Sequence, residues 1–372
     1  MFFYGTLCHA PLLELVLGRG FDQINTRPAT LENHAVYWAK DQAFPMIYAE
    51  ENTVAEGLLV CDLSQDDLDR LNFYEGGFAY ELRPVEVAVD GRVFAAQVYF
   101  PDETLWEKGA RWSLEDWAAT WSRMTLRAAQ EVMVRRGHVS AQEIVHLLPF
   151  FRARAWAQEL AETPAPQTLR NPMSSQDIDI VEDRPGFNGF FQVKAFQVSH
   201  KKFDGTQSPA LPRETFMSFD VALLLPYDPV TDQVLLIEQV RFGTFNRGDP
   251  APWVLEPIAG LVDAGEAPRD AAIRESAEEA HLNLTQLIDM PKVYASPGYS
   301  TEFFHCYLGI CDLGGRGQGQ GGLASENEDI RNHVISFHHA MDLVDSGEVN
   351  VAPLAMMLLW LCRKRESLRA QL

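Results

Sequence analysis

The sequence predicts an α/β protein of two domains. The chain has 372 residues, enough for two or three domains, and an ordinary hydrophobic fraction of 47%. A short proline-bearing segment, TPAPQ at 163–167, separates a helical stretch from a second set of strand-like runs. In the second half, these runs are split around a helix and followed by a last helix, a pattern typical of an α/β/α sandwich.

The first domain, residues 1–105, is expected to be a small mixed α+β domain. Its aromatic-rich start predicts a strand that ends at Gly5-Thr6. Asp90-Gly91 predicts a tight hairpin, because both residues of such a turn take positive φ. Ser64 opens a short helix at 66–71. Further strands are expected at 35–39, 54–62, 82–89 and 93–100.

Residues 106–167 are expected to form a helical spacer and the linker. Helical spacing relates four apolar residues: Trp117, Trp121, Met124 and Ala128. Ser113 with Asp116, and Ser140 with Glu143, resemble the capping boxes that begin helices. We expect this segment to pack on the first domain.

The second domain is expected at 168–372, with a strand region at 168–219 and the sandwich at 220–372. The expected strands lie at 178–182, 191–200, 214–219, 220–225, 233–241, 253–258, 292–295 and 303–310, and the last helix at 351–365. A glycine-rich stretch at 314–322, GGRGQGQGG, predicts a mobile loop rather than a core element.

A helix from Pro268 to His281 follows a Gly/Asp turn in the second domain. We expect Ile273 to lie on its apolar face, with Ala277 and Ala280. Three glutamates fall on the opposite face: Glu275, Glu278 and Glu279. Like charges at this spacing repel, and oxygen ligands suit a hard cation such as Mg²⁺ or Mn²⁺. The alternative is a solvated acidic face.

The stretch GLVDAGEAPRDAAIRESAEEAHL at 260–282 resembles the Nudix box. The matching residues are Gly260, Glu266, Arg274, Glu275, Glu278, Glu279 and Leu282. Ser276 departs from the box, which has a bulky apolar residue there. His281 replaces a glycine, and we expect a different helix end because glycine there supplies a left-handed cap.

The second half is similar to the ADP-ribose pyrophosphatase branch of the Nudix hydrolases. Matching stretches are LLIEQVRFGTF, PWVLEPIAGLVDAGE, ASPGYSTE and SENEDIRNHVI, and Pro297 stands fifteen residues after Leu282. The resemblance implies Mg²⁺, with Mn²⁺ as a possible substitute. The implied metal ligands are Ala259 through its carbonyl, Glu275, Glu279 and Glu328, with Glu278 completing the cluster. It also implies Glu326 as the catalytic base.

The same resemblance implies substrate contacts and a homodimer in which both chains build the pocket. The implied contacts are Phe190, Phe191, Arg213, Glu214, Arg241, Leu261, Ser296, Pro297, Gly298 and Glu302. The two phenylalanines suit adenine stacking, and Arg241 suits a phosphate. Taken alone, Phe190 and Phe191 are more often core residues, and Arg213 is more often part of a surface ion pair. Ser218 stands where the branch can place an arginine.

The first domain resembles the gamma-glutamylcyclotransferase-like (AIG2-like) family. The resemblance rests on FYGTL at 3–7 and on LDRLNFYEGG, which ends with Glu75-Gly76, followed by Tyr80 and Arg83. It implies that Glu75 is a general acid and base. It also implies that the turn binds substrate through Tyr4, Gly5, Thr6 and Leu7. Glu75 as a solvated or capping residue is the alternative. Proteins grouped with tellurite resistance have a similar two-domain arrangement.

Charge, apolar runs and cysteine count narrow the possible binding partners and the expected cellular compartment. The formal net charge of −21 opposes a nucleic-acid-binding surface, which needs clustered Lys and Arg. The start lacks the basic region of a signal peptide, and the apolar run LAMMLLWLC is too short to span a bilayer. Five dispersed cysteines fit reduced thiols and a cytoplasmic protein.

The expected function is Mg²⁺-dependent hydrolysis of ADP-ribose to AMP and ribose 5-phosphate. One alternative is hydrolysis of another nucleoside-diphosphate sugar, such as GDP-mannose. A second is cyclisation of a gamma-glutamyl compound by the first domain, and a third is a sensor that binds ADP-ribose without cleaving it. The three glutamates oppose the sensor.

Overall fold

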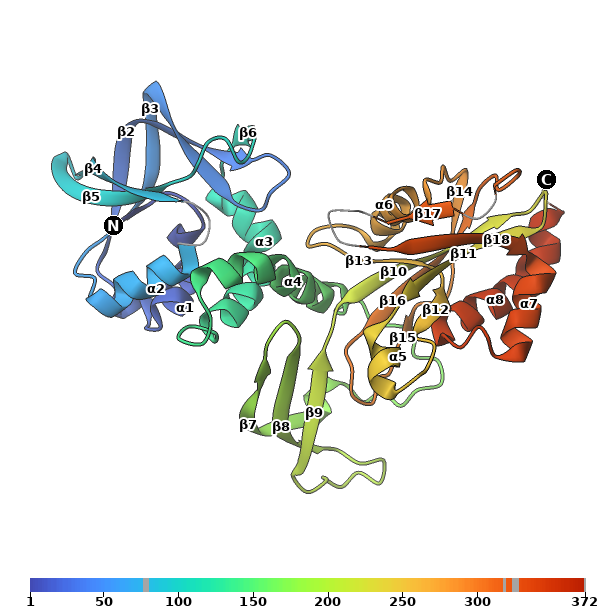
Figure 1. Cartoon of the computed structure of the whole chain (residues 1–372). Coiled ribbons are helices and arrows are strands. Elements are labelled where there is room, and N and C mark those ends of the chain that lie inside the picture. Colours follow the sequence, from blue (N-terminus) through green and yellow to red (C-terminus); the bar gives the residue numbers. More distant parts are fainter. Residues whose placement is uncertain (76–79, 317–318, 323–327, 371–372) are drawn as a thin grey trace. The chain divides into compact units, whose positions relative to one another are not determined.

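The computed structural model describes residues 1–75, 80–316, 319–322 and 328–370 of the chain. Two compact units make up the fold, Met1–Glu162 and Thr163–Leu372 (Figure 1). Each is a mixture of strands and helices, as the sequence predicts. No helix within the described ranges is both long and apolar enough to cross a membrane.

The first unit contains one antiparallel sheet in the order β1-β3-β2-β4-β5, with β6 paired to β2. Its strands are β1 Phe2–Phe3, β2 Thr26–Ala39, β3 Pro45–Val60, β4 Glu81–Val89, β5 Arg92–Phe100 and β6 Lys108–Arg111. Its helices are α1 Ala10–Leu17, α2 Gln65–Glu75, α3 Leu114–Met133 and α4 Ala141–Leu160, with short 3-10 turns η1 at Thr6–Cys8 and η2 at Phe21–Gln23.

Local signals predicted several of these elements well. The Asp90-Gly91 hairpin joins β4 to β5, and both residues have positive φ, 50° and 74°. Serine caps α4 through the expected box of Ser140 and Glu143. The first strand is shorter than predicted, because the chain turns into η1 after Gly5. Helix α1 is not among the elements expected from the sequence.

The two helices expected as a spacer belong to the first unit. Trp117 on α3 is fully buried, and its Nε1 donates a 2.9 Å hydrogen bond to the Ala43 carbonyl. Leu12 and Leu13 on α1 are buried in the same core cluster. Burial of a large aromatic side chain with its polar atom satisfied ties α3 to the rest of the unit.

The second unit contains a small sheet and a large one. The small sheet has the order β7-β8-β9, with β7 Ile178–Asn188 after the turn η3 (Ser175–Asp177), β8 Gln192–His200 and β9 Leu211–Met217. The main path of the large sheet is β14-β16-β10-β11-β18-β17. Its strands are β10 Asp220–Asp228, β11 Gln233–Val240, β12 Trp253–Glu256, β13 Ile258–Leu261, β14 Gln286–Asp289, β15 Val293–Tyr294, β16 Phe303–Ile310, β17 Gly319–Gly321 and β18 Ile330–Ser336.

Helices cover both faces of the large sheet, which gives the predicted α/β/α sandwich (Figure 1). The helices are α5 Phe242–Arg247, α6 Pro268–Ala280, α7 Phe337–Ser346 and α8 Ala352–Arg369. Leu223 and Leu225 of β10 pack with Leu358 of α8 in one core cluster. Helix α6 contacts β10 and β13 on the other side. Helix α5 is not among the elements expected from the sequence.

Three expectations about α6 and its surroundings were wrong. Ile273 is 47% exposed, whereas Glu279 is 2% exposed and faces the sheet with small residues, because small side chains let the helix approach closely. His281 adopts the left-handed conformation at φ 49°, so the helix ends as a glycine would end it. Gly319–Gly321 forms β17, although residues 317–318 and 323–327 lie outside the described part.

Candidate active site

The site is built where β13 leads through a turn into α6. Strand β13 pairs antiparallel with β10, so that Leu223 lies opposite Ala259 and Ala222 opposite Gly260. A Cβ atom at position 260 would overlap the carboxylate of Glu275. Glycine is therefore required for the α6 carboxylates to lie against the β13 backbone.

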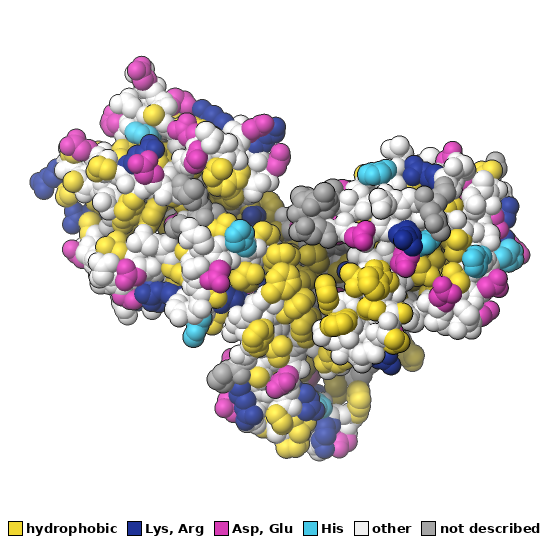
Figure 2. Space-filling model, in the orientation of Figure 1, with side chains coloured by type: hydrophobic (Ala, Val, Ile, Leu, Met, Phe, Trp, Pro, Cys, Tyr) yellow, Lys and Arg dark blue, Asp and Glu magenta, His cyan; other side chains and the backbone are white. Residues whose placement is uncertain are grey.

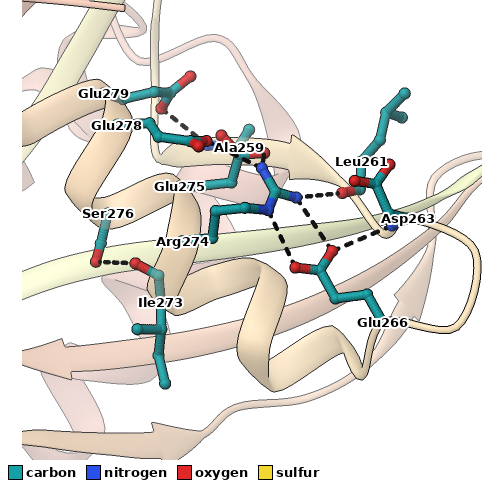
Figure 3. A network of polar contacts seen from close by, with 10 residues as sticks. All are labelled: Ala259, Leu261, Asp263, Glu266, Ile273, Arg274, Glu275, Ser276, Glu278 and Glu279. Atoms are coloured by element: carbon teal, nitrogen blue, oxygen red, sulfur yellow. Dashed lines mark hydrogen bonds and ion pairs between the residues drawn. The ribbon is translucent and has the colours of Figure 1, made fainter. Parts of the chain in front are cut away.

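Arg274 supplies a positive charge among the glutamates (Figure 3). Its Nη1 donates to Glu275 Oε1 at 2.6 Å and to Glu278 Oε2 at 3.0 Å. Its Nε donates to Glu266 Oε1 at 3.0 Å, and its Nη2 donates to the Leu261 carbonyl at 3.1 Å. The repulsion expected within the glutamate row is thus partly offset by an arginine of the same helix, and these bonds raise the pKa of Arg274.

Glu279 lies deepest of the three α6 glutamates. The Ala259 amide donates to its Oε2 at 3.2 Å. Burial, together with the nearby charges of Glu275 and Glu328, raises the pKa of Glu279 to about 9. Burial also raises the pKa of Glu275 to about 7, against the opposing effect of Arg274. Desolvated carboxylates that repel one another hold protons until a cation compensates their charge.

The donor set fits a hard divalent cation, although the side chains do not form a finished cage. Within residues 1–75, 80–316, 319–322 and 328–370, no three His, Cys, Asp or Glu side chains are grouped closely enough to hold a metal ion. Glu275 is turned toward Arg274 instead. The fit rests on the mutually repelling carboxylates of Glu275, Glu279 and Glu328, of which Glu279 is buried and the other two are half-buried. Glu326, the expected base, lies outside the described residues.

Arg241 is the cation on the other side of the site. Its Nε donates to Glu256 Oε2 at 2.7 Å. Its charge acts on both Glu279 and Glu302, where it opposes the effect of burial, which raises the pKa of each carboxyl. The structure therefore brings Arg241 and Glu302, two residues far apart in sequence, to the α6 carboxylates.

An aromatic cluster joins the small sheet to the large one. The rings of Phe190 and Phe191 lie 4.8 Å apart, and Phe191 lies 4.7 Å from Phe216. Phe190 and Phe191 are each 40% exposed, so each keeps an accessible surface. This partial exposure suits stacking on a flat ligand better than the alternative of a closed core.

Strand β9 is tied to the expected substrate segment at 296–302. The Phe216 amide donates to the Tyr299 carbonyl at 2.7 Å, and the Ser218 amide donates to Thr301 Oγ1 at 2.8 Å. Ser218 is thus a buried link between segments. Ser296, Pro297 and Gly298 precede this link. Arg213 and Glu214 are exposed on β9, where Arg213 Nη1 donates to the Pro212 carbonyl at 2.8 Å.

Two polar side chains, neither of them expected from the sequence, donate hydrogen bonds to backbone carbonyls at the C-terminal end of α6. Asn332 Nδ2 donates to the Glu279 carbonyl at 3.1 Å. Arg316 donates to the Ala280 carbonyl from Nη1, at 3.1 Å, and to the His281 carbonyl from Nη2, at 3.0 Å. These bonds satisfy carbonyls that a helix end leaves without partners. No sequence spacing links them to the helix: Asn332 lies on β18, and Arg316 lies in the segment after β16.

A second buried carboxylate lies in the first unit, at Glu75, the last residue of α2. Burial raises its pKa to about 7. Four tyrosines are close enough for the charge of Glu75 to raise their pKa values: Tyr4, Tyr74, Tyr80 and Tyr99. Tyr4 donates to the Tyr99 carbonyl at 3.0 Å, and Tyr99 donates to Asn72 Oδ1 at 2.6 Å.

The expected binding turn lies beside this carboxylate, through Tyr4. Gly5 precedes η1, which contains Thr6 and the buried Leu7. A Cβ at Gly5 would come within 2.7 Å of Pro45 Cγ. Gly76, the partner of Glu75 in the expected pair, lies outside the described residues. The structure therefore gathers a turn, a buried carboxyl and several phenols within one unit.

Two family descriptions match the chain, one in each unit. Residues 1–119 match the family described as "Gamma-glutamyl cyclotransferase, AIG2-like", and residues 217–354 match the family described as "NUDIX domain".

Curated relatives match the second half. The chain is 38% identical over 190 residues to an "ADP-ribose pyrophosphatase" of Haemophilus influenzae, covering 50% of this chain and 87% of that protein. It is 35% identical over 204 residues to an "ADP-ribose pyrophosphatase" of Escherichia coli K12, covering 55% of this chain and 97% of that protein. A "GDP-mannose pyrophosphatase" of Escherichia coli is 26% identical over 187 residues, covering 50% of this chain and 96% of that protein. The chain therefore belongs to the Nudix hydrolases, with an AIG2-like domain at its N-terminal end.

Proposed function

We propose that the second unit hydrolyses the pyrophosphate bond of ADP-ribose and releases AMP and ribose 5-phosphate. The observation that favours this substrate is the identity of 35–38% to relatives named for ADP-ribose, against 26% to one named for GDP-mannose. The location of Arg241 near Glu279 and Glu302 supports it, because a diphosphate needs both a cation from the protein and a metal site.

The proposed metal ligands are Glu275, Glu279, Glu328 and the Ala259 carbonyl. Held by these oxygens, Mg²⁺, or Mn²⁺ in its place, would supply positive charge against the diphosphate and lower the pKa of a water. Arg274 orients Glu275 and Glu278 through its Nη1 hydrogen bonds.

The remaining residues bind substrate or accept a proton. Glu326 accepts the proton of the attacking water. Arg241 binds the diphosphate, and Phe190 and Phe191 stack on the adenine. The further proposed contacts are Leu261, Ser296, Pro297, Gly298, Glu302, Arg213 and Glu214. We propose that Arg213 and Glu214 on the exposed strand β9 act across a homodimer of this cytoplasmic enzyme.

Figure 2 shows no continuous basic surface on the visible face of the described residues. Lys and Arg side chains are interspersed with Asp and Glu side chains over the visible face of the described residues. A nucleic acid needs a continuous basic surface.

Release of AMP from ADP-ribose tests this function. Glu279→Gln removes a metal ligand, and Glu326→Gln removes the base, so each is expected to lower kcat at least about 100-fold. Glu238→Gln is the control, because Glu238 pairs with His333 at 2.8 Å on β18. Full activity of Glu279→Gln contradicts the metal assignment, and full activity of Glu326→Gln contradicts the base. Faster turnover of GDP-mannose than of ADP-ribose contradicts the substrate.

We propose a second activity for the first unit, the cyclisation of a gamma-glutamyl compound to 5-oxoproline. The observation that favours it is the pKa of Glu75, about 7, which suits a group that accepts and returns a proton at neutral pH. Glu75→Gln is expected to abolish 5-oxoproline formation. Absence of 5-oxoproline with the unaltered protein and a panel of gamma-glutamyl compounds contradicts the activity.

A further inference from the structure

Arg241 reaches the active site with its guanidinium already held at one end. The residue follows β11, and its backbone amide donates to the Pro252 carbonyl at 2.9 Å. Its side chain is 44% exposed, and Nε donates to Glu256 Oε2 at 2.7 Å. Nε lies at the inner edge of the guanidinium, so this bond fixes the plane of the group while Nη1 and Nη2 extend beyond it.

Glu256 is itself fixed by the sheet. Strands β11 and β12 are antiparallel, with Ile237 opposite Glu256 and Gln239 opposite Val254. Gln239 is 9% exposed, and its Nε2 donates to the same Glu256 oxygen at 3.2 Å. The Glu256 side chain is only 13% exposed. A carboxylate fixed by a buried amide is a rigid acceptor for the arginine.

Arg241 lies close enough to the carboxylates of the site for its charge to act on them. The positive charge of Arg241 opposes the effect of burial on the pKa of Glu279 of α6 and on that of Glu302, although the two residues come from different parts of the chain. Glu256 binds Nε and not Nη1 or Nη2 of Arg241. These two nitrogens, near a carboxylate proposed to bind metal, can donate to two oxygens of a phosphate at once.

We propose that Glu256 is the positioning residue for diphosphate binding, and that it acts only through Arg241. It orients the guanidinium by the Nε bond and leaves Nη1 and Nη2 for the phosphate oxygens of the substrate. This inference rests on the proposed function, since it names how that site recognises its substrate. The Nε hydrogen bond from Arg241 to Glu256 also reduces the rotamer freedom that Arg241 loses when the diphosphate binds.

A double-mutant cycle measures the dependence of Glu256 on Arg241. Glu256→Ala is expected to raise KM for ADP-ribose about tenfold and to change kcat by less than about threefold. In the Arg241→Ala background the same change is expected to add less than about twofold, because the partner is gone. Glu256→Gln keeps an oxygen acceptor and the volume, and is expected to raise KM about threefold. Glu238→Gln on the neighbouring strand β11 is the control, with KM unchanged.

Equal effects of Glu256→Ala with and without Arg241 overturn the inference, because they indicate a packing role for β12. An unchanged KM overturns it too. If Glu256→Ala fails to fold, the same cycle is run with Glu256→Gln.

Binding of inorganic pyrophosphate without Mg²⁺, followed by calorimetry, separates this inference from the proposed function. Glu256→Ala is expected to weaken pyrophosphate binding about tenfold. Undiminished binding overturns the inference even when ADP-ribose is hydrolysed. Weakened binding, in a protein that does not hydrolyse ADP-ribose, supports Glu256 while the proposed substrate is rejected.

Discussion

The α6 site of the second unit and the Glu75 site of the first unit both contain carboxyl groups shielded from water, but the neighbours of these groups differ. Around α6, Arg274 pairs with Glu275 and Glu278, and the Ala259 amide donates to Glu279. Around Glu75, desolvation alone raises the pKa, and the neighbours are tyrosines. A carboxylate surrounded by fixed charges suits ion and phosphate binding, whereas a carboxyl among phenols suits proton transfer near neutral pH.

The largest expected effect is the loss of Arg274. Arg274→Met removes the cation from Glu266, Glu275 and Glu278, and partly buried carboxylates without a partner are costly. The free energy of unfolding of the metal-free protein is expected to fall by about 3 kcal/mol. Arg269→Met on the same helix is the control, since Arg269 pairs with the exposed Asp289 and is worth less than about 1 kcal/mol. Denaturation in urea measures both, and equal losses contradict the role of Arg274.

The next effect tests the Glu75 site by pH. The pKa of Glu75 is raised from an ordinary 4.5 to about 7 in the folded state, so the folded state favours the proton. Stability from this group is therefore full below pH 4.5 and is lost as pH rises to about 7, a change of about 3 kcal/mol. Glu75→Gln should remove this loss and raise the melting temperature at pH 8 but not at pH 4.

Glu81→Gln is the control for this experiment, because Glu81 is an exposed partner of Arg83. A melting temperature at pH 8 that Glu75→Gln leaves unchanged would show that the carboxyl is solvated.

A smaller effect tests how β17 supports α6. A Cβ at Gly321 would overlap the Glu279 carbonyl, whereas nothing lies within 4 Å of one at Gly319. Gly321→Ala is expected to cost about 1–3 kcal/mol, because the strand must move away from the helix. Gly319→Ala is the matched control and should cost less than about 1 kcal/mol. Equal unfolding free energies for the two variants refute the close approach.

The smallest effect concerns the end of α6. His281 lies in the left-handed region at φ 49°, and its Nδ1 lies 3.1 Å from the Ala277 carbonyl. His281→Gly relieves backbone strain and should raise the free energy of unfolding by about 0.5–1 kcal/mol. His281→Val should lower it, because a β-branched residue tolerates this conformation poorly. A stabilising valine would contradict this account.

Local sequence signals predicted the elements whose geometry depends on neighbouring residues. The Asp90-Gly91 turn, the Ser140 capping box and the start of α6 at Pro268 all needed only nearby residues. Periodicity failed on the faces of α6, where Ile273 is exposed and Glu279 is buried. The hydrophobic pattern misled because this helix packs through small residues, which carry a weak periodic signal.

Only part of the candidate site could be predicted from the sequence. Glu275, Glu278 and Glu279 stand out by their spacing, and Arg241 stands out by resemblance to a family. Glu256, Asn332 and Arg316 do not, because their hydrogen-bond partners lie 15 to 53 residues away in the chain. Strand register, and not spacing along the chain, decides such contacts.

The sequence by itself determined the two-domain composition, the glutamate row and the family, because these depend on residue type and order. Only the tertiary structure decided that Arg274 neutralises part of that row, that Glu279 is the buried member and that Glu256 holds Arg241. The physical reason is that burial and pairing depend on which strands meet. The residue type determines that a side chain carries a carboxyl group, but the fold determines its pKa and its partner.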